Sequence, residues 1–198
     1  MAAVNVAGMG DHFQTIVDLD ATAADAPRLA ERVLGVLVAE GVVLPERTDG
    51  PFGQYLPGPH WHKAAGPRDT DWAPTDGLTA HTGRTVFHGG QGEAEWARCP
   101  RCTATIRLLT DEYDWIDAAW EPYERAMSRW RETGEAAVTC PGCTAAVPLA
   151  EWTWAGDYYA FGSLGFEFWN WPELGEAFRG LVADALGGHR TTLVWGKF

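Results

Sequence analysis

All four cysteines of the chain lie in two short segments of matching sequence, CPRCTATIRL (99–108) and CPGCTAAVPL (140–149). A C-x-x-C spacing forms a tight turn whose two thiolates point the same way, so two such turns supply the four sulfur ligands of a tetrahedral Zn²⁺ site. Those ligands would be Cys99, Cys102, Cys140 and Cys143. Thiolates would then fill every coordination position, which leaves no place for water or substrate. The sequence therefore predicts one structural zinc that stabilises the fold.

Each cysteine pair is followed by a short alternating, strand-like tail, and over roughly residues 95–152 the chain resembles zinc-ribbon modules. The resemblance implies a small subdomain built from two hairpins of the same design. The 37 residues between the pairs (103–139) exceed the usual ribbon spacing and carry an apolar stripe at helical intervals. That stripe predicts a helix that packs the ribbon onto the rest of the chain, and it consists of Ile116, Trp120, Tyr123, Met127 and Trp130.

Three other readings of the cysteines stay open. Rubredoxin-like proteins hold redox-active iron with similar pairs, although they typically carry Gly where Thr103 and Thr144 follow the motifs here. A glutaredoxin-like C-P-x-C would open a helix, whereas each motif here leads into a strand pattern. Disulfides would require an oxidising compartment, and the chain shows neither a secretory signal nor a transmembrane segment. We therefore expect a cytoplasmic protein whose cysteines bind metal.

A second candidate site is the segment His60-Trp61-His62. In an extended segment residues i and i+2 point the same way, so both imidazoles could meet one metal ion. The remaining ligands of a two-histidine-plus-carboxylate site would come from Asp69, Asp71, His81 and His88. The competing interpretation is a pair of solvated loop histidines, because an isolated H-x-H motif has low specificity.

Tryptophan is abundant, with eleven in the chain. Trp169 and Trp171 would share one face of an extended strand, as would Trp152 and Trp154, and such pairs can stack a sugar, a base or a cation. They can equally fill the core. The formal net charge of −12 argues against nucleic acids and anionic membranes as partners, and it leaves a protein partner or a homodimer open.

The two ends of the chain share one order of elements. A strand pattern over 12–21, with Phe13, Thr15, Val17 and Leu19 facing the core, precedes a helix from about Asp25 to Gly41 and a short strand over 42–44. Near the C-terminus, a strand over 164–171 precedes a helix capped by Asn170, with Pro172 in its first turn, and a last strand over 190–198. These β-α-β units predict an α+β fold, a ferredoxin-like sandwich.

The predicted organisation is thus a sandwich formed by 12–45 and 160–198, a Pro/Gly-rich loop region over 46–94, and the zinc-ribbon-like insert over 95–152. The leading functional hypothesis is a non-enzymatic module, stabilised by one structural zinc, that binds a protein or another ligand. Its contact surface would be the Pro/Gly/aromatic loop 51–67, with His60, Trp61 and His62, together with exposed Trp residues such as Trp169 and Trp171. The alternatives are a metal-dependent hydrolase with a second metal at His60 and His62, and rubredoxin-like electron transfer by iron. The sequence indicates no catalytic residues, since it shows no G-x-S-x-G, H-E-x-x-H or Walker pattern.

Overall fold

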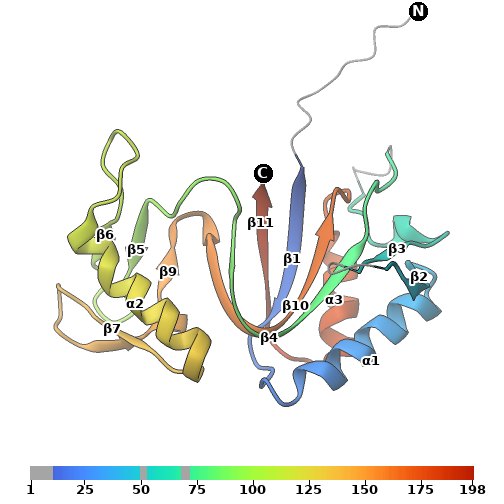
Figure 1. Ribbon diagram of the computed structural model, residues 1–198, viewed down its shortest axis with the longest axis horizontal. Helices are drawn as coiled ribbons and strands as arrows, with labels where there is room; N and C mark the ends of the chain where they lie inside the picture. The colour runs from blue at the N-terminus through green and yellow to red at the C-terminus, as the bar shows by residue number, and fades with distance from the viewer. Residues whose placement is uncertain (1–10, 50–52, 68–71) are drawn as a thin grey trace, which may run out of the picture.

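The structure, a computed structural model, describes residues 11–49, 53–67 and 72–198. It combines helices with antiparallel sheets, which confirms the α+β class (Figure 1). The main sheet has the strand order β11-β1-β10-β4-β3-β2. Its strands are β1 (His12–Asp18), β2 (Val43–Arg47), β3 (Tyr55–Pro57), β4 (Leu78–His88), β10 (Tyr159–Trp169) and β11 (Thr191–Lys197). Helix α1 (Ala26–Ala39) joins β1 to β2, and α3 (Glu176–Ala185) joins β10 to β11, as the two end units predicted.

Helices α1 and α3 cover one face of this sheet and form the larger core with it. The apolar stripe of α1 buries Leu29, Val33 and Leu37, and Pro27 lies at its start, where no intrahelical N–H is required. Gly41 ends the helix in a left-handed conformation with φ +69°. Phe166 and Phe168 of β10 contribute the largest buried side chains from the sheet to this core, so the aromatic strand near the C-terminus anchors both helices.

The side chains of β1 lie on other faces of the sheet than the sequence predicted. Ile16, expected on the polar side, lies in the helix-covered core, whereas Val17 packs on the opposite face with Phe87. Both faces are buried because the helices cover one of them and an apolar cluster with Phe87, Ala160 and Val194 covers the other. Leu19 lies beyond the end of the strand and is 38% exposed. Alternation of apolar residues identifies a strand, but it cannot assign the faces of a strand that is buried on both sides.

Strands β4 and β10, eleven residues each, bend so strongly that one end of each leaves the main sheet (Figure 1). Gly165 leaves room for Phe87 to pack on this ribbon, because a Cβ there would lie 2.5 Å from the Phe87 ring. Beyond the bend Gly90 forms a parallel bridge with Lys197 of β11, so the sheet coils back toward its own edge. The outer face of the bent ribbon carries Val86 and Phe161 into a second core. The same two strands therefore belong to both cores.

The finer prediction, a ferredoxin-like sandwich, is not confirmed. The strands of the two end units do occur in the order β11-β1-β10 and then β2, but β4 and β3 lie between β10 and β2. Both come from the region 46–94 that the sequence assigned to loops. The short helical turn η1 (Trp61–Lys63) also falls in that region. The loop region therefore supplies central structure of the main sheet.

The predicted start of the C-terminal helix is wrong. Helix α3 begins at Glu176 with Gly175 as its N-cap residue, not at Asn170. Asn170 instead adopts a left-handed conformation (φ +51°), accepts a hydrogen bond from His12 N–H at 3.0 Å and donates one to Asp76 at 2.7 Å. The following Trp171 donates its indole N–H to the carbonyl of Asp76 at 2.9 Å. These contacts across the sheet outweigh a local sequence pattern that satisfies every capping preference.

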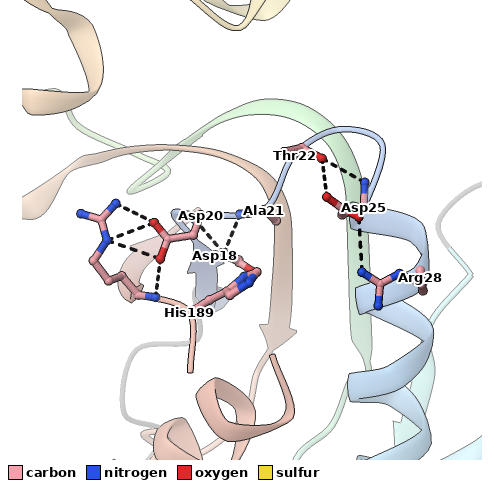
Figure 2. Close-up of polar contacts among 8 residues, drawn as sticks. Asp18, Asp20, Ala21, Thr22, Asp25, Arg28 and His189 are labelled. Carbon is pink, nitrogen blue, oxygen red and sulfur yellow. Dashed lines mark hydrogen bonds and ion pairs between the residues drawn. The ribbon is translucent and has the colours of Figure 1, made fainter. Parts of the chain in front are cut away.

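Two turns at one end of the sheet are tied together by carboxylates (Figure 2). Asp18, fully buried, accepts the backbone N–H groups of Asp20 and Ala21 at 2.8 and 2.9 Å and contacts Nδ1 of His189 at 2.9 Å. Asp20 receives the guanidinium of Arg190 at 2.6 and 3.0 Å. The turn after β1 is therefore fixed to the turn before β11.

Candidate metal centre

The cysteine subdomain is built from short antiparallel hairpins around one helix. Strands β5 (Trp96–Arg98) and β6 (Thr105–Arg107) flank the first cysteine pair, and β7 (Ala137–Thr139) and β8 (Ala146–Pro148) flank the second. Helix α2 (Asp117–Thr133) lies between the hairpins in sequence and packs against β7 and β4. The remaining elements of the subdomain are η2 (Leu149–Glu151), β9 (Thr153–Trp154) and η3 (Ala155–Asp157). The predicted pair of matching hairpins and the helix between them are both present.

The two cysteine turns share the same backbone hydrogen bonds. In the first turn Cys99 N donates to Ala104 O at 3.0 Å and Thr103 N donates to Cys99 O at 2.9 Å. In the second turn the equivalent bonds, Cys140 N to Ala145 O and Thr144 N to Cys140 O, measure 2.9 and 2.8 Å. The repeated sequence therefore folds into a repeated structure, and each turn presents its sulfurs on the same side.

The four sulfur atoms lie within 4.8 Å of one another. Across the two turns Cys99 Sγ is 4.0 Å from Cys143 Sγ, and Cys102 Sγ is 3.7 Å from Cys140 Sγ. A regular tetrahedron with metal–sulfur bonds of about 2.3 Å has sulfur–sulfur edges of about 3.8 Å. These separations are far beyond the ~2.0 Å of a disulfide bond, and all four cysteines are free. The cluster therefore has the dimensions of a tetrathiolate metal site.

Backbone dipoles support negative charge on the sulfurs. Arg101 N–H points at Cys99 Sγ (3.4 Å) and Gly142 N–H at Cys140 Sγ (3.3 Å). Burial opposes ionisation of Cys140, but the N–H groups of Cys143 and Gly142 outweigh it and lower the pKa of this thiol to about 7. For Cys102 the N–H of Ala104 favours the thiolate, yet burial and the neighbouring sulfurs raise its pKa to about 12. A bound cation would balance the negative charge of neighbouring thiolates at this site.

The residue after each C-P-x-C motif is conformationally special. Thr103 and Thr144 adopt left-handed φ values of +61° and +60°, which is costly for a β-branched residue. Each hydroxyl donates to the carbonyl of the preceding cysteine, at 2.6 and 2.7 Å. The turn thus requires a backbone conformation that glycine adopts most readily, and at the threonines a local hydrogen bond from the hydroxyl helps to stabilise it.

The structure does not bring the other predicted ligands together. His60 directly precedes a 3₁₀ turn that contains His62, so the segment is not extended; the two rings meet edge to face with centroids 6.1 Å apart, and within the described residues no third predicted ligand joins them. His60 Nδ1 lies 3.2 Å from the carbonyl oxygen of Glu40. Asp69 and Asp71 fall outside the described residues. Within the described residues the four cysteines form the one group of three or more His, Cys, Asp or Glu side chains placed to hold a metal ion.

The remaining predicted binding residues separate onto different surfaces. Trp61 is half-buried against the larger core and Trp171 is fully buried in it. Trp169 lies on the other face of the sheet, where its indole N–H donates to Glu167 Oε1 at 2.6 Å. Trp152 and Trp154 are buried in the second core around Tyr123, with ring centroids 5.0 and 5.2 Å from it. The left-handed Asn170 separates Trp169 from Trp171 and so divides the predicted aromatic pair.

Sequence reasoning missed a pocket where the cysteine subdomain meets the bent strands. We name this cavity of about 280 Å³ the junction pocket; its walls include Glu93, Trp120, Glu124, Arg131, Tyr158 and Tyr159. The lining comes from three separate stretches of the chain, and the sequence gave a signal only for Trp120 and Met127 of the helical stripe and for His88 as a possible metal ligand. The perturbed tyrosines mark the site as well, since burial raises the pKa of Tyr158 to about 12 and that of Tyr159 further.

Comparison of the chain with protein-family models, curated proteins and solved structures gives no match. The class of site is therefore defined by its geometry, a four-cysteine cluster that could hold a structural metal. No helix in the described part of the chain combines the length and the apolar character that crossing a membrane requires.

Proposed function

We propose that this chain is a non-enzymatic binding module whose cysteine subdomain is stabilised by one structural Zn²⁺. The observation that carries the proposal is the all-thiolate cluster, with sulfur–sulfur separations of 3.7 and 4.0 Å across the two turns. Four sulfurs complete the coordination of zinc, so the ion would have no open position for substrate. When bound, the ion would supply folding free energy to the subdomain.

The site's position explains why such a metal would matter for binding. The metal would join the β5–β6 and β7–β8 hairpins, and α2 lies between them in the chain. Helix α2 in turn packs on β4 of the main sheet. A zinc ion that fixes the hairpins would therefore fix the surface where the subdomain meets the main sheet. A reducing compartment such as the cytoplasm would keep the four thiols available.

The alternatives have less support. A hydrolase with a second metal at His60 and His62 requires ligands that the described residues do not bring together. Rubredoxin-like iron uses the same sulfur geometry, so it differs from zinc only in the ion bound. A protein partner or a homodimer stays part of the proposal, and the exposed Trp195 (61%) and Phe198 (49%) at the end of β11 offer one surface for either.

Native mass spectrometry of protein purified without added metal tests the metal assignment. We expect one Zn²⁺ per chain and a colourless solution. Cys143→Ala should lose the metal, whereas the matched neighbour Thr144→Ala, which removes a hydroxyl and no ligand, should retain it. A red protein that contains one iron per chain would contradict the zinc assignment and favour rubredoxin-like iron. Full retention of metal in Cys143→Ala would contradict the tetrathiolate site.

A further inference from the structure

The junction pocket is assembled from three parts of the chain: helix α2, the segment after β4 and the start of β10. Trp120, Glu124 and Arg131 recur on one face of α2, and Met127 of the same face is buried beneath them. Opposite them lie Tyr158 and Tyr159, where β10 begins. The segment that follows β4 closes the pocket with Glu93. Pockets between two packed units are common places for ligand binding.

The aromatic walls form a corner with fixed geometry. The rings of Tyr158 and Tyr159 are nearly perpendicular (82°, centroids 4.8 Å apart), and the ring of Trp120 lies within 22° of that of Tyr159 at 6.2 Å. Trp115 stacks on Trp120 at 4.2 Å. The Tyr158 hydroxyl lies 2.7 Å from the carbonyl oxygen of Gly90, which holds the ring in place. The walls are therefore organised before any ligand arrives, which reduces the entropy lost on binding.

The charges around the corner are not neutralised by one another. Among the described residues Glu93, Glu124 and Arg131 form no ion pair within 4.0 Å. The Tyr159 hydroxyl donates to Glu93 Oε2 at 3.4 Å, and partial burial raises the pKa of Glu93 above its usual range. Because the pocket lining holds two carboxylates and one guanidinium, the pocket carries an excess of negative charge beside partly exposed aromatic rings. The exposed His88 lines the same pocket and stacks on Tyr158.

We propose that the junction pocket binds an alkylammonium group, held between the aromatic corner of Trp120, Tyr158 and Tyr159 and the carboxylates of Glu93 and Glu124. Ring faces and carboxylates both attract a cation, and the attraction strengthens as the cation is desolvated. The chain's net charge of −12 also favours a cationic ligand over an anion. This inference rests on the proposed function, since it names the ligand class and the surface of the binding module. The cavity volume suits a small ammonium ion or the end of a lysine side chain.

The test uses metal-loaded, full-length protein and isothermal titration with matched probes. Choline and n-butylammonium represent a quaternary ion and a lysine side chain, and 3,3-dimethyl-1-butanol is the neutral isostere of choline. We expect saturable binding of an ammonium probe with a dissociation constant on the order of 1 mM. Binding should be at least tenfold weaker for the neutral isostere. Equal binding of choline and its isostere, or no binding of either cation, would overturn the proposal.

Variants separate a cation site from an anion site. Trp120→Ala and Glu93→Gln should each weaken ammonium binding about tenfold or more, whereas Arg131→Gln should strengthen it severalfold because a like charge is removed. The matched controls Trp72→Ala and Glu132→Gln, which lie outside the pocket lining, should leave it unchanged. Weakened binding in Arg131→Gln would contradict the proposal. Glu93 is exposed, so its substitution tests the site even if Trp120→Ala fails to fold.

Which of the two cations binds more tightly indicates where the natural ammonium group comes from. Tighter binding of choline indicates a small quaternary ligand, and tighter binding of n-butylammonium indicates a lysine side chain on a polypeptide; either order supports the ammonium site. Native mass spectrometry of the same samples tests the structural zinc separately from the ammonium site. Metal-loaded protein that binds no cation contradicts this inference alone, whereas metal-free protein contradicts the proposed zinc.

Discussion

The fully buried carboxylate of Asp18 lies 2.9 Å from Nδ1 of His189, a residue 171 positions further along the chain. The same carboxylate caps the backbone N–H groups of Asp20 and Ala21 (Figure 2). One side chain thus fixes the turn into α1 and the turn into β11, which lie at adjacent ends of neighbouring strands. Stability at this end of the sheet therefore depends on a buried polar contact as well as on the apolar core.

Replacement of Asp18 should strongly destabilise the protein. Asp18→Ala leaves two backbone N–H groups and His189 without their acceptor, and each unsatisfied buried donor costs about 1–3 kcal/mol. We expect the free energy of unfolding to fall by about 3 kcal/mol, measured by urea denaturation. The matched control is Asp20→Asn, whose ion pair with the exposed Arg190 lies at the surface and should contribute much less. Similar losses in the two variants would contradict a special role for the buried carboxylate.

Replacing a threonine after a cysteine motif by glycine should increase the stability of the protein. At φ values near +60° a β-branched residue is strained by about 1–2 kcal/mol, and glycine removes the strain. Thr144→Gly also loses a hydroxyl bond and backbone entropy, so we expect a net stabilisation of up to about 1 kcal/mol. Thr144→Ala keeps the strain and loses the bond, so it should destabilise the protein. Thermal unfolding of the metal-loaded forms measures both, and glycine ranking below alanine would contradict the strain argument.

How much of this architecture can be read from sequence depends on how local its causes are. The cysteine hairpins were predictable because each motif contains all of its turn chemistry within six residues, Cys99–Ala104 and Cys140–Ala145. Helices α1 and α2 were predictable from their apolar stripes. These features need no information from distant parts of the chain.

The features that the sequence analysis mispredicted or missed depend on contacts between distant parts of the chain. Strand β4 lacks apolar alternation, and it is held by pairing with β10, about eighty residues away. Asn170 satisfied the rules for a helix cap, but its contacts to His12 and Asp76 depend on the completed sheet. The junction pocket joins three distant segments, so no single stretch could reveal it. Where local propensity does not specify the conformation of a segment, pairing across the sheet therefore determines it.

Removal of the metal should unfold the cysteine subdomain before the main sheet. The two apolar cores are distinct, and the metal ligands belong only to the second. We therefore expect chelation to raise hydrogen-exchange rates in β5, β7 and α2 at least a hundredfold, while β1, which pairs with strands on both sides, stays protected. Because β4 and β10 belong to both cores, their outer halves should lose protection and their inner halves should keep it. Equal loss of protection throughout the chain would show that the two cores unfold as one unit.

Glu167 should make stability depend on pH on the face of the sheet opposite the helices. Burial raises the pKa of this carboxyl, but His81, whose Nε2 lies 3.2 Å away, and the indole N–H of Trp169 outweigh burial and hold the pKa below its usual range. A depressed folded pKa means that the carboxylate adds stability above the unfolded value of about 4.3 and loses it as pH falls through the folded value.

Comparison of the wild type with Glu167→Gln by urea unfolding between pH 3 and 6 isolates this contribution, because the other carboxylates are common to both proteins. The stability advantage of the wild type should be full at pH 6 and should shrink as the pH falls below about 4. His81→Gln and Trp169→Phe each remove a contact that favours the ionised form, so each should reduce the pH-dependent part of the difference. A wild-type advantage that stays constant across this range would mean that the carboxylate does not gain its stability from these two neighbours.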